Sequence, residues 1–451
     1  MKLILNATIF SIEFFLYLKK KFQDYNRECH MFIEEYNAKT LMRKSSPSLF
    51  SWSEHYLNPY QGCFHDCQYC DGKSEVYHMH EDFGNRIRVK KNAPHLLERF
   101  LKSQGLISSH QHSTLDNHLT LGGSRGYPKS NFILFIGGGV CDVYQPAEKQ
   151  VKITRTLLHL AYMYNVPVQI LTKNTLALRD LDLFKKINET TYAAVNFSIT
   201  LADERAQKIF EPRASTTTER FNAIQKLRGE GIHSGVYFYP PLPFIGDTDE
   251  NMLAIFQKAI DVGAEFVYVW SLTLKPGRNK ISFLRTIQKH YPHLLSKYRQ
   301  LYGNNNKYGT LDYFQLKRLN LIYPEIKSFK YNHEFSLPYT SKRYIPPGRI
   351  ENNLRLVEIL LRAAYIASWI IREKSSGETY QLNKAATFLE KHPKDVFELD
   401  KSEFRRLNIP QAAHPYIIDF FLNGKSTLLE ELEKKAYNIV LEKLENLTLF
   451  S

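Results

Sequence analysis

The sequence predicts an α/β protein, a partial (βα)6 barrel of the TIM type followed by a mainly helical C-terminal domain. Two observations support this prediction. Between residues 132 and 272, short apolar runs alternate with stretches of helical periodicity, which is typical of βα units around a parallel sheet. From about residue 301 this alternation stops, and long amphipathic helix patterns follow. A chain of 451 residues is long enough for one large barrel plus an accessory region.

Five of the six expected strands follow one another along the chain. They are apolar runs at 132–138, 166–173, 192–200, 233–243 and 265–272. Helical patterns separate them, at 148–165, 178–188, 216–231 and 249–263. A sixth strand is expected before the others, near residues 56–60. Together these elements predict the parallel sheet of the barrel.

Pattern and composition divide the chain into three predicted regions. Residues 1–50 form an N-terminal extension, residues 51–300 the barrel, and residues 301–451 a basic and aromatic linker with a helical domain. The helical domain is predicted from residues 354–374 and 427–447, where apolar positions recur with helical spacing.

The apolar run at residues 3–18 does not predict a membrane span. A spanning helix needs about 20 apolar residues, whereas this run has 16 and contains Asn6 and Glu13. Its stronger basic cluster follows the run and no small-residue cleavage site is evident, unlike a signal peptide. We expect no membrane association. The run is interpreted as an amphipathic extension, or as sequence upstream of a start at Met31.

The chain is basic but otherwise of ordinary globular composition. Hydrophobic residues make up 43% and charged residues 24%, which excludes a wholly disordered or collagen-like chain. The net charge of +14 is compatible with nucleic acid as a partner, and equally with a solvated basic surface. The same two interpretations apply to Arg86, Arg88, Lys90 and Lys91 and to the basic and aromatic residues at 302–349.

Three of the five cysteines lie within eight residues, as Cys63, Cys67 and Cys70. A disulfide framework needs an even set in a small secreted domain, so this usage indicates ligation in a reducing compartment, and we expect a cytoplasmic protein. Thiolates are the protein ligands of iron–sulfur clusters, and three from one loop leave one iron of a four-iron cluster open. Zinc is the alternative metal, because Cys67 and Cys70 have the spacing of a zinc pair, although no second pair exists. Nearby histidines that would complete such a zinc site are His55, His65, His78 and His80.

The segment NPYQGCFHDCQYC carries Cys-x3-Cys-x2-Cys with an aromatic residue, Tyr69, before the last cysteine. This pattern resembles the signature of the radical S-adenosylmethionine (SAM) superfamily. The surrounding sequence is similar to the branch related to spore photoproduct lyase. The similarity covers roughly residues 31–275, through DFGNRIRVKKNAP, GGGVCDVYQPAEK, ILTKN, SITLADERAQKIFEPRAS and YPPLPFIGDT.

The resemblance implies an enzyme with a partial barrel and two cofactors. Cys63, Cys67 and Cys70 are expected to hold a [4Fe-4S] cluster, and SAM is expected to chelate its fourth iron. Tyr69 is then expected beside the adenine. One-electron reduction releases a 5′-deoxyadenosyl radical, which abstracts a substrate hydrogen atom. Such an enzyme requires an external electron donor, a flavodoxin or a ferredoxin.

The predicted strand at 132–138 ends at a run of glycines. By the resemblance, Gly137, Gly138 and Gly139 take the methionyl amine of SAM through backbone groups, and an ordinary strand-to-helix turn is the alternative. Active sites of barrel folds lie at the C-terminal ends of the strands, where glycine permits a close backbone approach. Lys173 ends the next strand and is a further cofactor-binding candidate, against a solvated loop lysine.

The later strand ends supply four more candidates for cofactor binding. By the resemblance, Ser198 and Thr200 touch the ribose or the carboxylate of SAM, and outward-facing hydroxyls are the alternative. Glu211 and Arg213 are predicted to form an ion pair that closes the site, against ordinary surface charges. A further strand ends at residues 239–241, which are expected to shape the cavity.

The residues after the glycines allow two interpretations. Asp142, Tyr144, Gln145 and Glu148 either contact cofactor or substrate, or cap the following helix. Spore photoproduct lyases use a cysteine near this place as a hydrogen donor. Cys141 is out of register with that cysteine, and it is either such a donor or an inert buried residue.

Three functions are consistent with these features. One is repair of a DNA photolesion, in which a radical abstracts hydrogen from a fused pyrimidine dimer and a carbon–carbon bond is cleaved. Another is a radical reaction on a different substrate, such as RNA or a protein. The third is a zinc-stabilised nucleic-acid-binding module without catalysis. Metal content and SAM cleavage under reductant distinguish the radical enzyme from the binding module.

Overall fold

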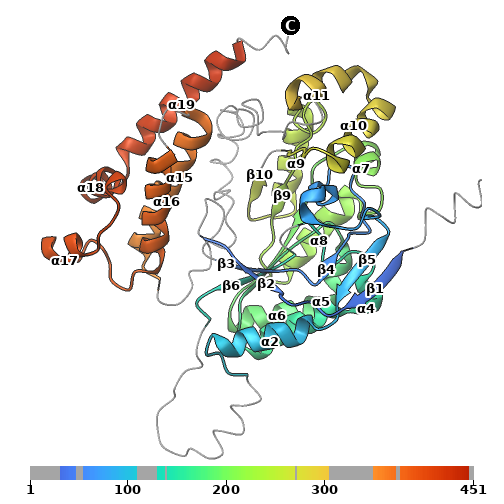
Figure 1. The fold of residues 1–451 in the computed structure, drawn as a ribbon, viewed down its shortest axis with the longest axis horizontal. Helices are drawn as coiled ribbons and strands as arrows, with labels where there is room; N and C mark the ends of the chain where they lie inside the picture. Colours follow the sequence, from blue (N-terminus) through green and yellow to red (C-terminus); the bar gives the residue numbers. More distant parts are fainter. Residues whose placement is uncertain are drawn as a thin grey trace, which may run out of the picture.

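A computed structural model describes residues 31–46, 54–108, 130–137, 140–269, 272–303, 349–371 and 376–445. Its central sheet has seven strands in the order β10-β9-β8-β7-β6-β3-β2 (Figure 1). Six of them run parallel in sequence order: β3 (Glu54–Leu57), β6 (Ile133–Ile136), β7 (Val168–Thr172), β8 (Ala193–Ser198), β9 (Val236–Phe238) and β10 (Val267–Val269). This confirms the partial (βα)6 barrel, including the sixth strand expected near residues 56–60.

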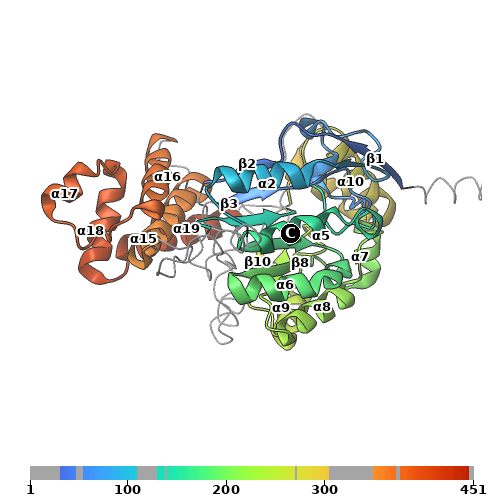
Figure 2. The ribbon, with the colours of Figure 1, turned by 90° about the horizontal axis from the view of Figure 1, so that it is seen from below.

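Helices connect the parallel strands and cover the outer side of the sheet (Figure 2). They are α2 (Ala93–Ser103), α4 (Glu148–Val151), α5 (Ile153–Met163), α6 (Leu181–Thr190), α7 (Glu204–Phe210), α8 (Thr217–Gly229) and α9 (Asp249–Asp261). Two further helices, α10 (Arg278–His290) and α11 (Leu295–Tyr302), follow the last strand, β10. Because helices cover one face and side chains fill the other, every residue of β6 and β8 is buried.

Local sequence explains where several elements begin and end. Helix α8 starts at a capping box, in which Thr216 and Glu219 bond each other's backbone N–H groups. Strand β9 is shorter than the predicted run at 233–243, because Pro240 and Pro241 follow it and have no N–H to donate to a neighbouring strand.

The region predicted as an N-terminal extension contributes one strand to the central sheet and one strand to a second, three-stranded sheet with the order β1-β5-β4. Strand β1 (Phe32–Tyr36) pairs in parallel with β5 (Arg86–Lys90), which pairs antiparallel with β4 (Tyr60–Gln61). Strand β2 (Met42–Lys44) pairs antiparallel with β3 at the edge of the central sheet. The division of the chain at residues 50 and 300 stays a prediction.

The basic side chains of β5 bond mainly to the chain itself. Arg86 donates to Glu34 Oε2 through Nε (2.9 Å) and Nη2 (2.6 Å), and Arg88 lies 4.3 Å above the Tyr36 ring centroid. Lys90 Nζ donates to a backbone carbonyl oxygen at 2.9 Å. This strand therefore does not present a free basic stripe. Most of the basic and aromatic segment at 302–349 lies outside the described residues.

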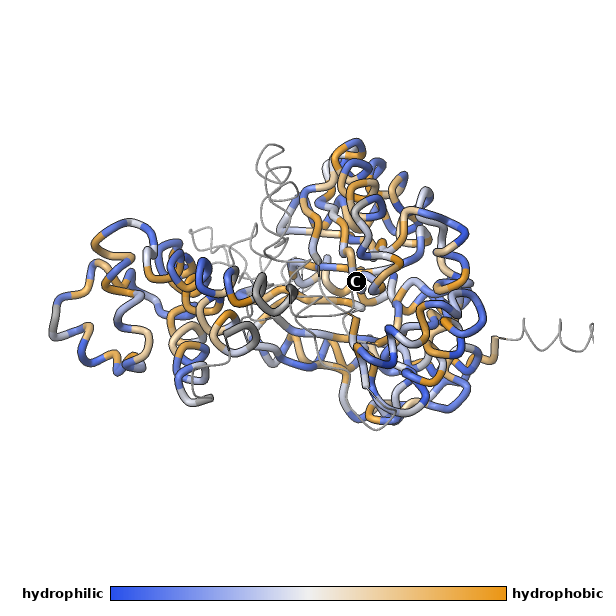
Figure 3. The backbone as a smooth tube through the Cα atoms, turned by 90° about the horizontal axis from the view of Figure 1, so that it is seen from above, coloured by the Kyte–Doolittle hydropathy of each residue, from blue (hydrophilic) through white to orange (hydrophobic). Residues whose placement is uncertain are grey.

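A separate group of helices forms the C-terminal region (Figure 1). It consists of α15 (Glu351–Tyr365), a π-helical turn (Ile366–Ile371), α16 (Ser376–Lys391), α17 (Lys401–Arg406), α18 (His414–Asn423) and α19 (Thr427–Glu445). Hydrophobic and hydrophilic residues alternate along these helices, as amphipathic packing requires (Figure 3). This confirms the predicted helical region. No helix within the described ranges is long and apolar enough to cross a membrane.

One histidine considered as a zinc ligand lies in an aromatic cluster on β3 instead. The His55 ring centroid is 4.8 Å from that of Phe100 and 4.7 Å from that of Phe132. Burial, followed by the charges of Lys44 and Lys391, lowers the pKa of His55 from 6.5 to about 4. The imidazole is therefore neutral at pH 7.

We expect His55 to make the folded protein less stable as the pH falls. Between pH 6.5 and about 4 the unfolded chain binds a proton at this residue and the folded chain does not, so acidification favours unfolding. A His55→Phe variant should show a flatter dependence of its urea midpoint on pH over this interval. Parallel profiles for the variant and the natural protein would contradict this expectation.

Candidate active site

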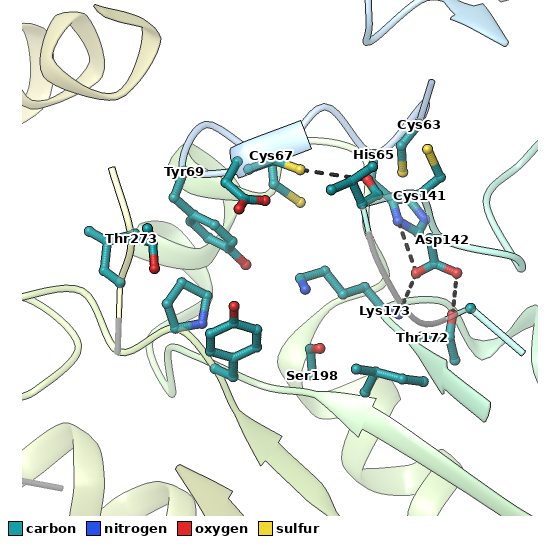
Figure 4. A pocket seen from close by; sticks show the side chains of 18 residues that line it. Cys63, His65, Cys67, Tyr69, Cys141, Asp142, Thr172, Lys173, Ser198 and Thr273 are labelled. Atoms are coloured by element: carbon teal, nitrogen blue, oxygen red, sulfur yellow. Dashed lines mark hydrogen bonds and ion pairs between the residues drawn. The ribbon is translucent and has the colours of Figure 1, made fainter. Parts of the chain in front are cut away.

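A cavity lies where the C-terminal ends of the parallel strands meet the cysteine loop, residues 62–70 (Figure 4). Its empty volume is about 790 Å³, which includes the open space at its mouth. The strand ends that line it include Gly137, Thr172, Lys173, Ser198 and Tyr239. This is the end of the barrel at which active sites of such folds are built.

The conformation of the cysteine loop depends on its glycine. Gly62 has φ +81°, and a Cβ atom there would meet the Arg86 carbonyl oxygen at 2.3 Å, so only glycine fits against β5. At the other end of the loop, the Cys70 N–H donates to the Cys67 carbonyl oxygen at 3.1 Å and closes a tight turn. The turn brings both thiols to the cavity.

Cys63, Cys67 and Cys70 all line the cavity, and none of them is in a disulfide. Burial is the main cause that raises the pKa of the Cys70 thiol to about 11 and holds the pKa values of Cys63 and Cys67 well above the usual one. A thiol must lose its proton to ligate a metal, so loading of this site releases protons.

The donor set fits a four-iron cluster. Among the described residues, no three His, Cys, Asp or Glu side chains converge as ligands of a single metal ion. A four-iron cluster takes each thiolate at a different iron atom, so its ligands do not have to meet at one point. Of the four histidines considered above, His65 is the one that lines the cavity.

The Asp142 carboxylate contacts the end of β7, the cysteine loop and the backbone directly after Asp142 itself. Its carboxylate accepts bonds from the Thr172 hydroxyl (2.7 Å) and from the backbone N–H groups of Lys173 (2.7 Å) and Tyr144 (2.8 Å). His65 Nδ1 lies 3.3 Å away. Although burial opposes ionisation, His65 and these donors lower the pKa of Asp142 to about 2. The carboxylate therefore ties β7 to the cysteine loop.

Gln145 and Glu148 are structural. Gln145 accepts from the Phe64 N–H (2.8 Å) and donates to the Gly62 carbonyl (3.1 Å), which supports the cysteine loop from behind. Glu148 is fully buried away from the cavity and accepts the Thr154 N–H at 3.1 Å. For Glu148, the helix-capping interpretation is therefore the correct one.

Lys173 is the only lysine or arginine among the described residues that line the cavity. Its ammonium lies 5.7 Å from the centroid of the Tyr69 ring and points into the middle of the cavity (Figure 4). Ser198 lies on the neighbouring strand end and also lines the cavity. Thr200 is buried outside the lining. Of the three glycines, Gly137 lines the cavity, whereas Gly138 and Gly139 lie outside the described residues.

The predicted ion pair between Glu211 and Arg213 does not form. Glu211 pairs with Arg220 instead and accepts a bond from the Tyr69 hydroxyl. Arg213 donates to the Gly84 carbonyl at 3.0 Å, outside the cavity lining. The prediction was wrong because Glu211 caps the end of α7 and points inward, whereas the chain leaves the helix before Arg213.

Sequence reasoning missed Arg220, although a signal was present. The residue lies on the buried face of α8, beside Thr217, Phe221 and Ile224 at helical spacing. An arginine within such an apolar face is fully buried only when it is paired, so its position indicates a buried carboxylate partner.

A segment near α10 also holds the cysteine loop and was not predicted. The Asn279 side chain donates to the backbone carbonyls of Cys70 (2.9 Å) and Tyr69 (3.3 Å). Lys275 Nζ bonds the Asp71 carboxylate and the Tyr77 hydroxyl. No sequence motif marks these residues, because they lie some 200 positions from the loop that they support.

Comparison with known proteins identifies the family. Residues 57–259 match the model of the Radical SAM superfamily, so this part of the chain is a radical SAM domain. An uncharacterized protein of Mycobacterium tuberculosis is 25% identical over 296 residues, 64% of this chain and 79% of that protein. An uncharacterized protein of Methanocaldococcus jannaschii is 25% identical over 249 residues, 55% of this chain and 80% of that protein.

Solved structures of spore photoproduct lyase also match. The complex with a dinucleoside spore photoproduct has a TM-score of 0.43 and 17% identity, over 68% of this chain and 80% of that one. A cysteine-to-serine mutant of the same enzyme has a TM-score of 0.42 and 16% identity, over 68% and 80%.

Membership decides between the broad hypotheses. The protein is a radical SAM enzyme, and its family implies a [4Fe-4S] cluster, SAM and a source of reducing electrons. The zinc-stabilised binding module is set aside.

Proposed function

We propose that Cys63, Cys67 and Cys70 hold the [4Fe-4S] cluster and that SAM binds beside it in the cavity. The observation that carries this proposal is the convergence of the three unbridged thiols of the cysteine loop and one ammonium group on a single cavity at the C-terminal ends of the strands. When bound, these cofactors supply a reductive cleavage that yields a radical able to abstract a hydrogen atom from a substrate.

The residues of the chain would bind and orient SAM. Lys173 would hold its carboxylate, since it is the cation of the lining. Gly137 has φ +97°, and a Cβ there would lie 3.0 Å from the Leu171 carbonyl oxygen, so this turn requires glycine. The backbone groups of Gly137 would then bond the methionyl amine of SAM. Tyr69 would present its ring to the adenine, and the Ser198 hydroxyl would bond the ribose or the carboxylate. Burial of this wall keeps water from the reacting groups.

The experiment that tests this function is anaerobic reconstitution with iron and sulfide, followed by reduction with dithionite in the presence of SAM. We expect about four irons per chain and release of 5′-deoxyadenosine. Zinc binding without iron uptake, and no release, would overturn the proposal. A second assay with a flavodoxin or a ferredoxin in place of dithionite tests the expected class of electron donor.

Replacing Lys173 by methionine should raise the dissociation constant of SAM on the order of 10- to 100-fold. The reason is the loss of a hydrogen bond between two charged groups, about 1.5–3 kcal/mol. Equilibrium dialysis of the cluster-loaded, unreduced protein measures the constant. Lys173→Arg keeps the charge and is the control, with a smaller expected change. An unaltered constant in Lys173→Met would place the carboxylate elsewhere.

We propose a fused pyrimidine photolesion of DNA as the substrate class. Cys141 supports this choice, since its thiol belongs to the cavity lining, and the net charge of +14 suits a polyanion. A thiol at this place would return a hydrogen atom to the product radical. Dinucleoside spore photoproduct is the direct probe: the enzyme should convert it to the unlinked dinucleoside, and Cys141→Ala should impair this conversion. If the probe is untouched while 5′-deoxyadenosine is still released, the substrate belongs to another class.

A further inference from the structure

A single buried guanidinium bonds several parts of the cavity wall. Arg220 lies in the first turn of α8 and is fully buried. Its Nη1 donates to the Ser198 carbonyl oxygen at 2.6 Å and its Nε to the Ser215 carbonyl oxygen at 2.8 Å. Its Nη2 bonds the Glu211 carboxylate. All three sides of the guanidinium fork are therefore occupied by partners from different segments.

Each partner of Arg220 leads to a proposed SAM contact. Ser198 is itself a lining residue at the end of β8. Glu211, which is 1% exposed, also accepts the Tyr69 hydroxyl and so reaches into the cysteine loop. The Ser215 N–H donates to the Lys173 carbonyl oxygen at 3.2 Å, which holds the end of β7.

We propose that Arg220 is the positioning residue of the SAM site, which sets Tyr69, Lys173 and Ser198 at their places around the cofactor. This inference rests on the proposed function. It adds Arg220, which lies outside the cavity, to the residues that determine how SAM binds. Arg220 does not line the cavity, so it acts through its three partners and not by touching SAM.

Arginine is required here because of its planar fork. A guanidinium offers five N–H donors in fixed directions, whereas a lysine ammonium is a point charge on a flexible stem. Arg220→Lys keeps the charge opposite Glu211 but cannot hold both carbonyl oxygens as well. The strand ends and Tyr69 would then relax relative to one another, and small misplacements of binding groups are costly.

The same helix supplies a matched control. Arg228 lies near the other end of α8 and donates to the carbonyl oxygens of Gly263 (3.1 Å) and Ile232 (3.2 Å). It also pairs with the Glu265 carboxylate at 2.6 Å. Arg228 therefore resembles Arg220 in its kinds of partners, but none of its partners lines the cavity.

The test compares Arg220→Lys with Arg228→Lys in the cluster-loaded full chain. We measure iron content, the dissociation constant of SAM and the change that SAM causes in the EPR spectrum of the reduced cluster. We expect Arg220→Lys to keep about four irons while the constant rises on the order of 10- to 100-fold and the EPR change is altered. Arg228→Lys should remain within about twofold of the natural protein, since it leaves these supporting contacts intact.

The outcomes separate this inference from the proposed function. A natural protein without cluster or SAM binding would refute the proposed function, and the inference with it. Normal SAM binding and an unaltered EPR change in Arg220→Lys would refute the inference alone, as would an equal loss of SAM affinity in Arg228→Lys.

If Arg220→Lys does not fold, Tyr69→Phe is the deciding variant, because it removes the bond to Glu211 and leaves the buried ion pair between Glu211 and Arg220 intact. A rise of about threefold or more in the constant would support the inference, and no rise would overturn it.

Discussion

Replacing Cys63, Cys67 and Cys70 together by alanine is expected to reduce bound iron from about four atoms per chain to background and to abolish 5′-deoxyadenosine release. The reason is geometric as well as chemical. The three thiols lie on one loop, face one cavity and have no disulfide partner, so their removal takes away the whole thiol donor set of the loop. Iron and sulfide analysis after anaerobic reconstitution measures the effect.

Cys141 provides the matched control for this experiment. It is buried and lines the same cavity, but it lies outside the cysteine loop, after β6. Cys141→Ala should therefore keep about four irons and still release 5′-deoxyadenosine. A triple variant that retained its iron, or a Cys141→Ala variant that lost it, would require a different set of cluster ligands.

Replacing Glu148 by alanine is expected to lower the free energy of unfolding by about 3–5 kcal/mol. The Glu148 carboxylate is fully buried and accepts the Tyr60 hydroxyl and the backbone N–H of Thr154. It also lies 2.8 Å from Arg179 Nη2. Alanine leaves these buried donors without an acceptor, whereas each of them would bond water in the unfolded chain. The urea midpoint of the cluster-free protein measures the loss.

Glu148→Gln separates hydrogen bonding from charge in the same position. Glutamine keeps an oxygen that can accept the Thr154 N–H, and Arg179 retains its ion pair with Asp180 at 2.7 Å. We expect this variant to lose less than half as much stability as Glu148→Ala. Equal losses would show that the charge of Glu148, and not its hydrogen bonds, provides the stabilisation.

The order of the barrel strands was predictable because it depends on local patterns. Each apolar run that alternates with a helical pattern became a parallel strand beside the previous one, since short βα connections place consecutive strands next to each other. Strand lengths were less predictable. The run at 233–243 shows this, because the regular strand covers only residues 236–238, although His233 forms an isolated bridge with Ala194 before it and the prolines follow it.

The cofactor-binding roles of the site residues stay predictions, but the structure shows where these residues lie, and Thr200 just beyond the end of β8 is buried outside the cavity lining. Lys173 and Ser198 lie at the cavity as predicted, because the carboxyl ends of parallel strands share one edge. Glu211 was paired with the nearest arginine in sequence, yet its partner is Arg220 on the next helix. From beyond the sixth strand, Asn279 bonds the cysteine loop at Cys70 and Lys275 bonds Asp71 directly after it, contacts that no local pattern encodes.

The sequence by itself determined the class of fold, the family and the set of three clustered cysteines. These follow from periodicity and from spacings within a few residues, which can be seen in the sequence without knowledge of the fold. Only the tertiary structure decided that the cysteines face Lys173 and Ser198, that Asp142 ties β7 to their loop, and that Arg220 bonds the wall together. Such contacts join residues far apart in the chain, and burial makes each of them specific, because a buried charge must find its partners inside the protein.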